Sequence, residues 1–241
     1  MDIETATTPA LCLALLALLG APAEPAAGQA TQIKPRQMVV CTPTTVQIAG
    51  GKVETQRNPI AYALSQCGPG STIRLEPGTY PSLGIGFGHD KPWNARTSGG
   101  TPSQPITIFG TVGASIAAGP SEGDTISISA ATNPGWITFQ NVAIQPGYRS
   151  GVIFYKGPPN TVYPGFRFHD CDILGTWDHL ANRGGKSTWG VWAFGLKDFE
   201  FRGLRKRAVV SDLRKEHGFY LQNPKGDILI ENVDGKRLGR T

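Results

Sequence analysis

A basic pentapeptide and an inserted loop carry most of the side chains suited to acid–base chemistry. The pentapeptide 213–217 reads L-R-K-E-H, and the insertion 175–189 reads G-T-W-D-H-L-A-N-R-G-G-K-S-T-W. β-Elimination from a uronic acid needs a cation that neutralises the carboxylate, a base for the C5 proton and an acid for the leaving oxygen. A solvated basic turn would have the same composition, so both interpretations stay open. The candidate catalytic residues are Arg214, Lys215, His217, Asp178, His179 and Arg183.

A short repeated phrase must position these side chains. Each copy has two apolar residues one apart, then a polar residue, a turn residue and another apolar residue; the turn residues are Asn141, Asp170, Gly203 and Asn232, spaced by 29, 33 and 29. Such a period indicates a solenoid or a propeller. Glycine-led segments at 151–155, 190–194 and 218–222 alternate with the phrase. Like strands return only after a whole coil, so they pair in parallel. We therefore predict an all-β fold, a parallel β-helix, with a β-propeller as the alternative.

Stacked coils lie about 4.8 Å apart, so equivalent positions form columns. One interior column is predicted to hold Phe139, Phe168, Phe201 and Ile230. On the outer side, Arg167 would then lie beside Glu200, and Arg202 beside Glu231. This pattern fits either a solvated face with weak ion pairs or a charged groove that orients a ligand.

The glycine-led segments predict a row of outward aromatic residues. Ile153, Trp192 and Tyr220 would form one outward column, with Tyr155, Phe194 and Gln222 in the next. Exposed aromatic rows suit stacking against sugars or a partner; the alternative is that loop 174–189 folds over them. The candidate substrate-binding residues are Trp192, Tyr220, Tyr155, Phe194, Lys186, Arg167, His169 and Arg202.

The N-terminus carries an export signature. Residues 11–20 form an apolar run that is too short to span a bilayer, and small residues follow it. We expect 1–30 to be a signal peptide, 31–56 to be irregular and 57–241 to be the repeat domain, in a secreted or periplasmic protein. Cleavage would raise the net charge from +5 to +8, because 1–30 contains three acids and no base. A basic exported protein favours an anionic partner such as an acidic polysaccharide, and no nucleic-acid motif is present.

The first coil carries a family resemblance. Asn58-Pro59 is a helix start, and residues 70–80 read G-S-T-I-R-L-E-P-G-T-Y. Together with the repeated phrase, this segment resembles the right-handed parallel β-helix proteins of the pectin-lyase-like superfamily. The resemblance implies a right-handed coil with a short helix plugging its N-terminal end. That superfamily includes lyases, hydrolases and epimerases but also tailspikes and adhesins. The resemblance therefore leaves open a polysaccharide lyase or related enzyme and a non-catalytic module.

The cysteines and the possible metal ligands indicate less about function than the repeats do. Cys41 and Cys67 are the pair expected to form a disulfide, and Cys171 is expected to be a small buried hydrophobe. Residues 169–172 read H-D-C-D, but calcium needs six to eight oxygens and the sequence assembles no such set. We expect no metal site and no cofactor. Calcium is the one ion that stays possible. The chain stops just after the fourth phrase, which predicts that further coils follow and leaves the oligomeric state open.

Overall fold

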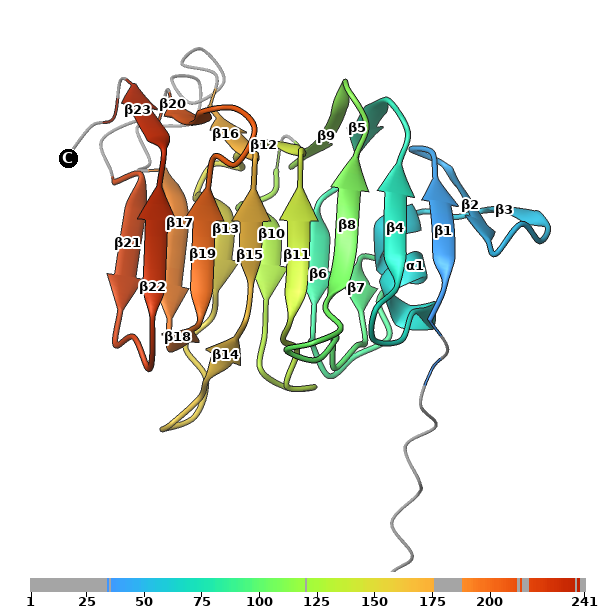
Figure 1. The fold of residues 1–241 in the computed structure, drawn as a ribbon, viewed down its shortest axis with the longest axis horizontal. Coiled ribbons are helices and arrows are strands. Elements are labelled where there is room, and N and C mark those ends of the chain that lie inside the picture. Colours follow the sequence, from blue (N-terminus) through green and yellow to red (C-terminus); the bar gives the residue numbers. More distant parts are fainter. Residues whose placement is uncertain are drawn as a thin grey trace, which may run out of the picture. The chain divides into compact units, whose positions relative to one another are not determined.

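The computed structural model describes residues 34, 36–119, 121–175, 188–211, 213, 217–236 and 238. The chain divides into two units, 1–33 and 34–241, and all described residues belong to the second. The described residues are mostly β, with one helix and three larger sheets among them (Figure 1). The prediction of an all-β fold is confirmed.

The strands fall into three larger sheets and one small one. Sheet A contains β22 (Ile228–Glu231), β19 (Phe199–Arg202), β15 (Arg167–His169), β11 (Ile137–Gln140), β8 (Ile106–Gly110), β4 (Thr72–Leu75), β1 (Met38–Cys41), β2 (Thr45–Ile48) and β3 (Val53–Thr55). Sheet B contains β23 (Val233–Lys236), β20 (Ala208–Ser211), β16 (Asp172–Leu174), β12 (Ala143–Gln145), β9 (Ala114–Ala117) and β5 (Gly78–Tyr80). Sheet C contains β21 (Phe219–Gln222), β17 (Trp189–Phe194), β13 (Ser150–Phe154), β10 (Asp124–Ile128), β6 (Leu83–Ile85) and β7 (Asn94–Ala95). Strands β14 (Tyr163–Pro164) and β18 (Leu196–Lys197) form the small sheet.

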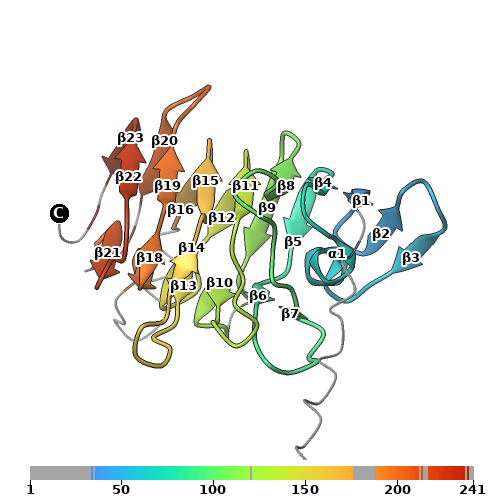
Figure 2. The same ribbon diagram turned by 60° about the horizontal axis from the view of Figure 1, so that its bottom comes forward.

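Apart from β1–β4 and β6–β7, successive strands belong to different sheets. From β8 onward the chain visits sheets A, B and C in turn, as in β8–β9–β10 and β11–β12–β13. From β8 onward, strands of one sheet therefore lie side by side in the order of the sequence (Figures 1 and 2). Pairing within sheets B and C is parallel throughout, and within sheet A from β1 to β22. The predicted parallel pairing of equivalent strands is confirmed.

The predicted interior column exists and is longer than the repeats suggested. Its register in sheet A runs through Val39, Ile73, Ile108, Phe139, Phe168, Phe201 and Ile230. The Phe139 and Phe168 rings stack at 5.0 Å, and those of Phe168 and Phe201 at 5.9 Å. Burial of these rings is complete. Because each such residue removes a large apolar surface from water, the column is a main source of stability.

The turn column forms as predicted at Asn141, Asp170 and Asn232, but the fourth predicted member, Gly203, does not have a left-handed backbone. Asn141, Asp170 and Asn232 have left-handed backbones with φ of 55°, 54° and 54°. The Asn141 amide donates to the Gly110 carbonyl of the previous coil at 2.7 Å, and the Asn232 amide donates to the Gly203 carbonyl at 2.9 Å. Asn and Asp tolerate this conformation better than other non-glycine residues, which explains their recurrence.

The N-terminal segment is more ordered than expected. Residues 31–56 were predicted to be irregular, but β1 joins sheet A parallel to β4, and β2 and β3 extend it as an antiparallel hairpin. That prediction is wrong because four-residue strands carry too little alternation to be seen in the sequence. Helix α1 (Pro59–Gln66) begins as predicted, with the Asn58 side chain accepting from the Ala61 N–H at 3.0 Å. No helix within the described residues is long and apolar enough to cross a membrane.

The three cysteines among the described residues, Cys41, Cys67 and Cys171, are buried free thiols. Cys41 and Cys67, the plausible disulfide pair, are therefore not joined in this structure. The Cys41 Sγ lies 3.8 Å from the Pro59 carbonyl oxygen, and the Cys67 thiol is hydrogen-bonded with Ser71. Burial raises the pKa of the Cys41 thiol to about 12, with the nearby Cys67 adding to the effect. Cys171 is completely buried, as predicted.

Candidate functional site

The outer face of sheet C carries the predicted aromatic residues. Strands β13, β17 and β21 pair so that Ile153, Trp192 and Tyr220 are neighbours, while Val191 and Ala193 point inward and are buried. The Tyr220 side chain is exposed. The predicted inward and outward positions are therefore confirmed for this sheet. Ile153 is nevertheless buried, so the rings do not form one uninterrupted exposed column.

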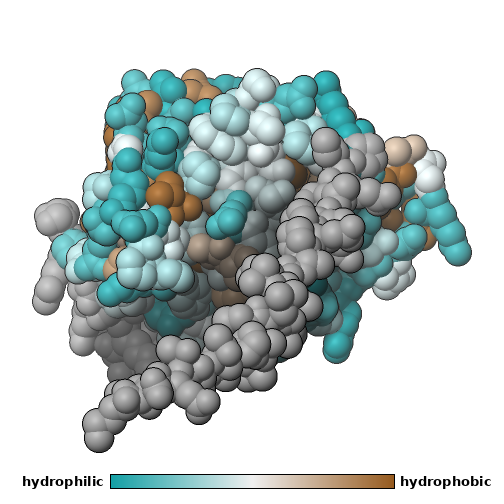
Figure 3. Space-filling view, turned by 90° about the horizontal axis from the view of Figure 1, so that it is seen from below, coloured by the Kyte–Doolittle hydropathy of each residue, from teal (hydrophilic) through white to brown (hydrophobic). Residues whose placement is uncertain are grey.

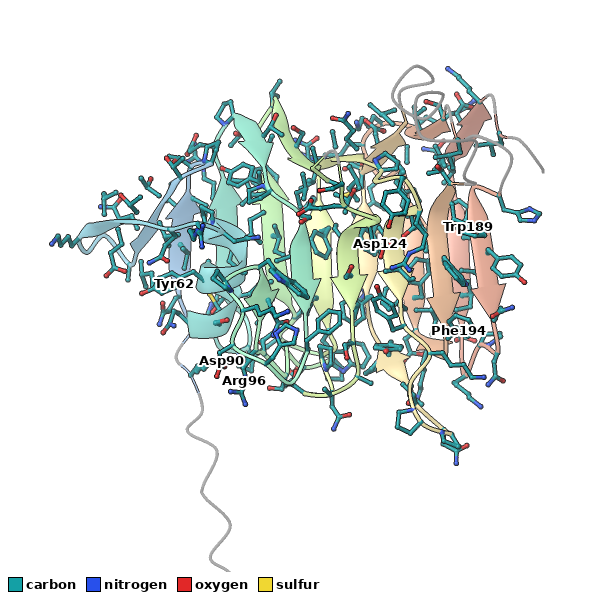
Figure 4. All side chains as sticks on the ribbon, turned by 180° about the vertical axis from the view of Figure 1, so that it is seen from behind. Tyr62, Asp90, Arg96, Asp124, Trp189 and Phe194 are labelled. Atoms are coloured by element: carbon teal, nitrogen blue, oxygen red, sulfur yellow. The ribbon has the colours of Figure 1, made fainter. Side chains whose placement is uncertain are left out.

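Aromatic residues follow the sheet from β21 towards β7 (Figure 4). Trp189 lies 4.6 Å from Trp192, which lies 6.1 Å from Phe194, as ring centroid distances. The Trp192 Nε1 is buried without a hydrogen-bond partner within the part of the chain that the structure describes. We name this set of residues the aromatic track; its members are Phe87, His89, Trp93, Tyr155, Trp189, Trp192, Phe194 and Tyr220.

The half of the track nearest β6 was not predicted. The Phe87 ring lies 5.8 Å from Tyr155 and 5.2 Å from Trp93. Trp93 lies over Gly84 of β6, where an added Cβ would come within 2.2 Å of the indole ring. The sequence signal is three aromatic or imidazole rings within residues 87–93, but only the path of the loop brings them onto the sheet.

A buried polar cluster lies beneath the track. The Asp124 carboxylate, only 4% exposed, accepts hydrogen bonds from the Arg149 guanidinium (Nε at 2.9 Å), the Ser150 hydroxyl (2.6 Å) and the Tyr155 hydroxyl (3.1 Å). The Arg149 guanidinium also donates to the Tyr155 hydroxyl at 2.6 Å. Four residues from two coils thus satisfy one another, which ties β10 to β13 and fixes the Tyr155 ring.

Two groups of this cluster have raised pKa values. The hydrogen bond that Arg149 donates to Asp124 raises the pKa of Arg149, and burial raises the pKa of Tyr155, with the Asp124 charge adding to it. Both shifts favour the protonated forms of Arg149 and Tyr155. Sequence reasoning missed Asp124 and Arg149 because they are 25 residues apart and Arg149 lies just before its strand.

The two segments expected to carry catalytic residues start and end side by side. Gly175 N–H donates to the Ser211 carbonyl at 3.0 Å, and Gly190 N–H to the His217 carbonyl at 3.2 Å. His217 itself stacks on Tyr220 at 5.7 Å. Arg214, Lys215, Asp178, His179, Arg183 and Lys186 lie outside the described residues. Of the catalytic candidates, the structure therefore places His217 at the end of the aromatic track.

The charged candidates lie on another sheet. Arg167, His169 and Arg202 project from sheet A and surround Glu200, at 3.3 Å, 2.8 Å and 3.7 Å from its carboxylate oxygens. Arg202 also pairs with Glu231 at 2.6 Å. The predicted neighbours Arg167–Glu200 and Arg202–Glu231 are confirmed. These side chains already have carboxylate partners and are not part of the aromatic track, so the structure does not bring the two candidate sets together.

Two cavities border the track at the loop after β13. One of about 700 Å³ reaches Tyr155, and one of about 490 Å³ reaches Phe194. Both are lined by Lys156 and its loop, residues 156–161, which separates them. Seen from the side of these loops, the surface is mostly hydrophilic with small hydrophobic areas in its hollows (Figure 3). Such a surface suits a polar ligand with apolar faces better than an extended apolar partner.

No group of three or more His, Cys, Asp or Glu side chains able to hold a metal ion occurs within the described ranges. His169 bonds Glu200, and Asp170 and Asp172 bond the 204–209 segment, so the H-D-C-D run supplies no shared ligand set. Comparison of the chain with protein-family models, curated proteins and solved structures gives no match.

Proposed function

We propose that the chain is a right-handed parallel β-helix whose sheet C binds an acidic polysaccharide on its outer face. The cycling of the chain through three parallel sheets supports the coil. The interior column of residues, the turn column of asparagines and α1 at the first coil support the resemblance to the pectin-lyase-like superfamily. The proposal includes export, with residues 1–30 as the signal peptide. N-terminal sequencing of the secreted protein tests this part of the proposal.

The aromatic track is the observation that carries the proposal. Its rings lie on β21 and β17 and beside the ends of β13, β6 and β7, whereas β10 carries none. Neighbouring strands are about 4.8 Å apart, so a ligand that lies across the sheet would meet rings at intervals. Sugar rings have apolar C–H faces and polar edges, which match aromatic faces beside polar groups. The net charge of +5 favours a polymer with carboxylate or sulfate groups.

Binding is better supported than catalysis. The Asp124 carboxylate is saturated with donors, Arg149 is paired, and the Tyr155 phenol has a raised pKa. This cluster therefore supplies neither a free base nor a free cation for β-elimination. A non-catalytic binding module is the function that the described residues support, and a polysaccharide lyase is the alternative, which would need groups from 176–187 and 214–216.

Phe194→Ala tests the proposal, with Phe109→Ala as the matched control. Both phenylalanines are half-buried and outward-facing, but Phe109 lies on sheet A, beside Arg205. Removing one stacking ring should weaken binding to polygalacturonate, alginate or heparin by roughly three- to tenfold. Isothermal titration calorimetry with each polymer measures it.

The two variants should differ clearly in their affinity for the acidic polymers. Phe109→Ala should bind as the unaltered chain does, and equal losses in both variants would show that the track is not the binding surface. Ultraviolet absorbance of unsaturated uronates, followed with and without calcium, distinguishes the lyase. Formation of unsaturated products would show that the chain is a lyase and would contradict the proposal of a non-catalytic binding module.

A further inference from the structure

We propose that the cavity beside α1 binds the carboxylate or sulfate group of an acidic sugar residue at one end of the aromatic track. This inference rests on the proposed function. The cavity has a volume of about 630 Å³ and lies between the outer side of α1 and the loop 90–96. In Figure 4, Tyr62, Asp90 and Arg96 mark it, towards the opposite end of sheet C from Trp189 and Phe194.

The lining of the cavity is strongly basic. Lys34, Arg57, Lys91 and Arg96 face a single acid, Asp90. Asp90 is already paired with Arg96 at 2.8 Å. Within the described part of the chain, no carboxylate lies at ion-pair distance from Arg57 or Lys91. These two exposed cations are therefore available to an anionic group from outside.

One loop joins the cavity to the track. Lys91, Pro92 and Asn94 line the cavity, while Trp93 turns the other way and covers Gly84 on the face of sheet C. The buried Asn94 side chain fixes this arrangement, accepting from the Phe87 N–H at 3.1 Å and donating to the Phe87 and His89 carbonyls at 2.9 and 2.7 Å. A chain that leaves the rings of Phe87 and Trp93 thus meets the cations next.

Other polar groups at the cavity are less available. The Tyr62 hydroxyl bonds Glu54 at 2.9 Å, and the Asn58 side chain bonds the Ala61 N–H and the Ser82 carbonyl. Recognition at this end would therefore depend mainly on charge, with Arg57 and Lys91 as the specificity-determining pair. Binding through such exposed cations should weaken as salt is added.

Arg57→Gln and Lys91→Gln test the inference, with Lys52→Gln as the matched control. Lys52 is exposed in the β2–β3 hairpin and does not line the cavity. The probes are hexagalacturonate, a sulfated heparin hexasaccharide and neutral cellohexaose, titrated calorimetrically at low salt. A charge-assisted contact is worth roughly a factor of ten in affinity, so each cavity variant should bind one or both acidic probes about tenfold more weakly. Its weak binding of cellohexaose should be unchanged.

The outcomes separate the two proposals. Lys52→Gln should stay within about twofold of the unaltered chain, because a distant charge is screened. If Arg57→Gln and Lys91→Gln lose no more than Lys52→Gln while Phe194→Ala still loses affinity, the cavity inference is overturned and the track remains. If the unaltered chain binds none of the acidic probes, both proposals fail. The probe with the larger loss identifies carboxylate or sulfate as the recognised group.

Discussion

Asp170 shows how one residue can serve the turn and the next coil together. Its backbone is left-handed, and its buried carboxylate accepts from the N–H groups of Leu204 and Arg205 at 2.7 Å and from the Arg205 guanidinium at 2.8 Å. Burial alone would raise the pKa of Asp170, but these donors outweigh it and lower the pKa to about 2. The charged form is therefore the one that the fold requires.

This pKa predicts acid sensitivity. A carboxylate whose pKa is lower in the folded state stabilises the fold above its unfolded value, near 4, and loses that stabilisation as pH falls towards 2. Asp170→Asn keeps the turn, as Asn141 does, but loses the charge. It should cost about 1–2 kcal/mol at pH 7 and flatten the fall in stability between pH 4 and 2, measured by urea unfolding. If Asp170→Asn lost stability between pH 4 and 2 as steeply as the unaltered chain, this prediction would be contradicted.

The Asp124 cluster predicts two unequal losses. Tyr155→Phe removes one hydroxyl and should cost about 1 kcal/mol. Asp124→Ala leaves the half-buried Arg149 without its carboxylate and should cost about 2–3 kcal/mol, less than for a fully buried pair because Arg149 is 37% exposed. Unfolding in urea measures both. Equal losses would mean that the cluster does not act through the charge of Asp124.

At the scale of the elements, turns and strands set the stacking of coils. Asn141→Ala removes the hydrogen bond to Gly110 and places alanine at φ 55°. Each effect costs about 1 kcal/mol, so the variant should lose about 2 kcal/mol. Differential scanning calorimetry measures the loss. The neighbouring Gln140→Ala, on the outer side of β11, should change little, and a comparable loss there would contradict a special role for the turn.

Strand orientation was predictable, whereas loop paths were not. The repeated phrase fixed the pairing of Arg167 with Glu200, because equal spacing in a parallel sheet places like positions together. Trp93 reaches Gly84 only because Asn94 holds the loop back against β6, and no sequence period encodes that contact. Strands β1, β2 and β3 were missed for the related reason that three or four residues show no clear alternation.

At the scale of the whole described unit, the interior column predicts a gradient of sensitivity. Phe168 is completely buried and stacks on both neighbours, so Phe168→Ala should cost about 3–5 kcal/mol. Ile230 occupies the same column in the last coil but is 41% exposed. Ile230→Ala should therefore cost only about 1 kcal/mol. Similar losses at the two positions, measured by thermal unfolding, would show that Ile230 is covered in solution.

The candidate site was predictable only where the repeat extends into it. Trp192, Phe194 and Tyr220 follow from the glycine-led strands, so their side of the sheet could be inferred. Asp124 and the cavity beside α1 depend on contacts between loops and the first coils, which lie outside the repeated phrase. The charged candidates lie on sheet A and the aromatic candidates lie on sheet C. The sequence did not predict this difference, because the repeat predicts columns but not which of the three sheets a ligand would face.

The constant spacing of the strands in sheet C has a consequence for ligand length. Six strands at about 4.8 Å give the aromatic track a span of about 24 Å. If the track binds a chain lying across the strands, affinity should rise with each added sugar until the oligosaccharide reaches that span and then level off. Titration with a graded series of oligogalacturonates would show the plateau. The sheet would then act as a molecular ruler, selecting oligomers by size as well as by charge.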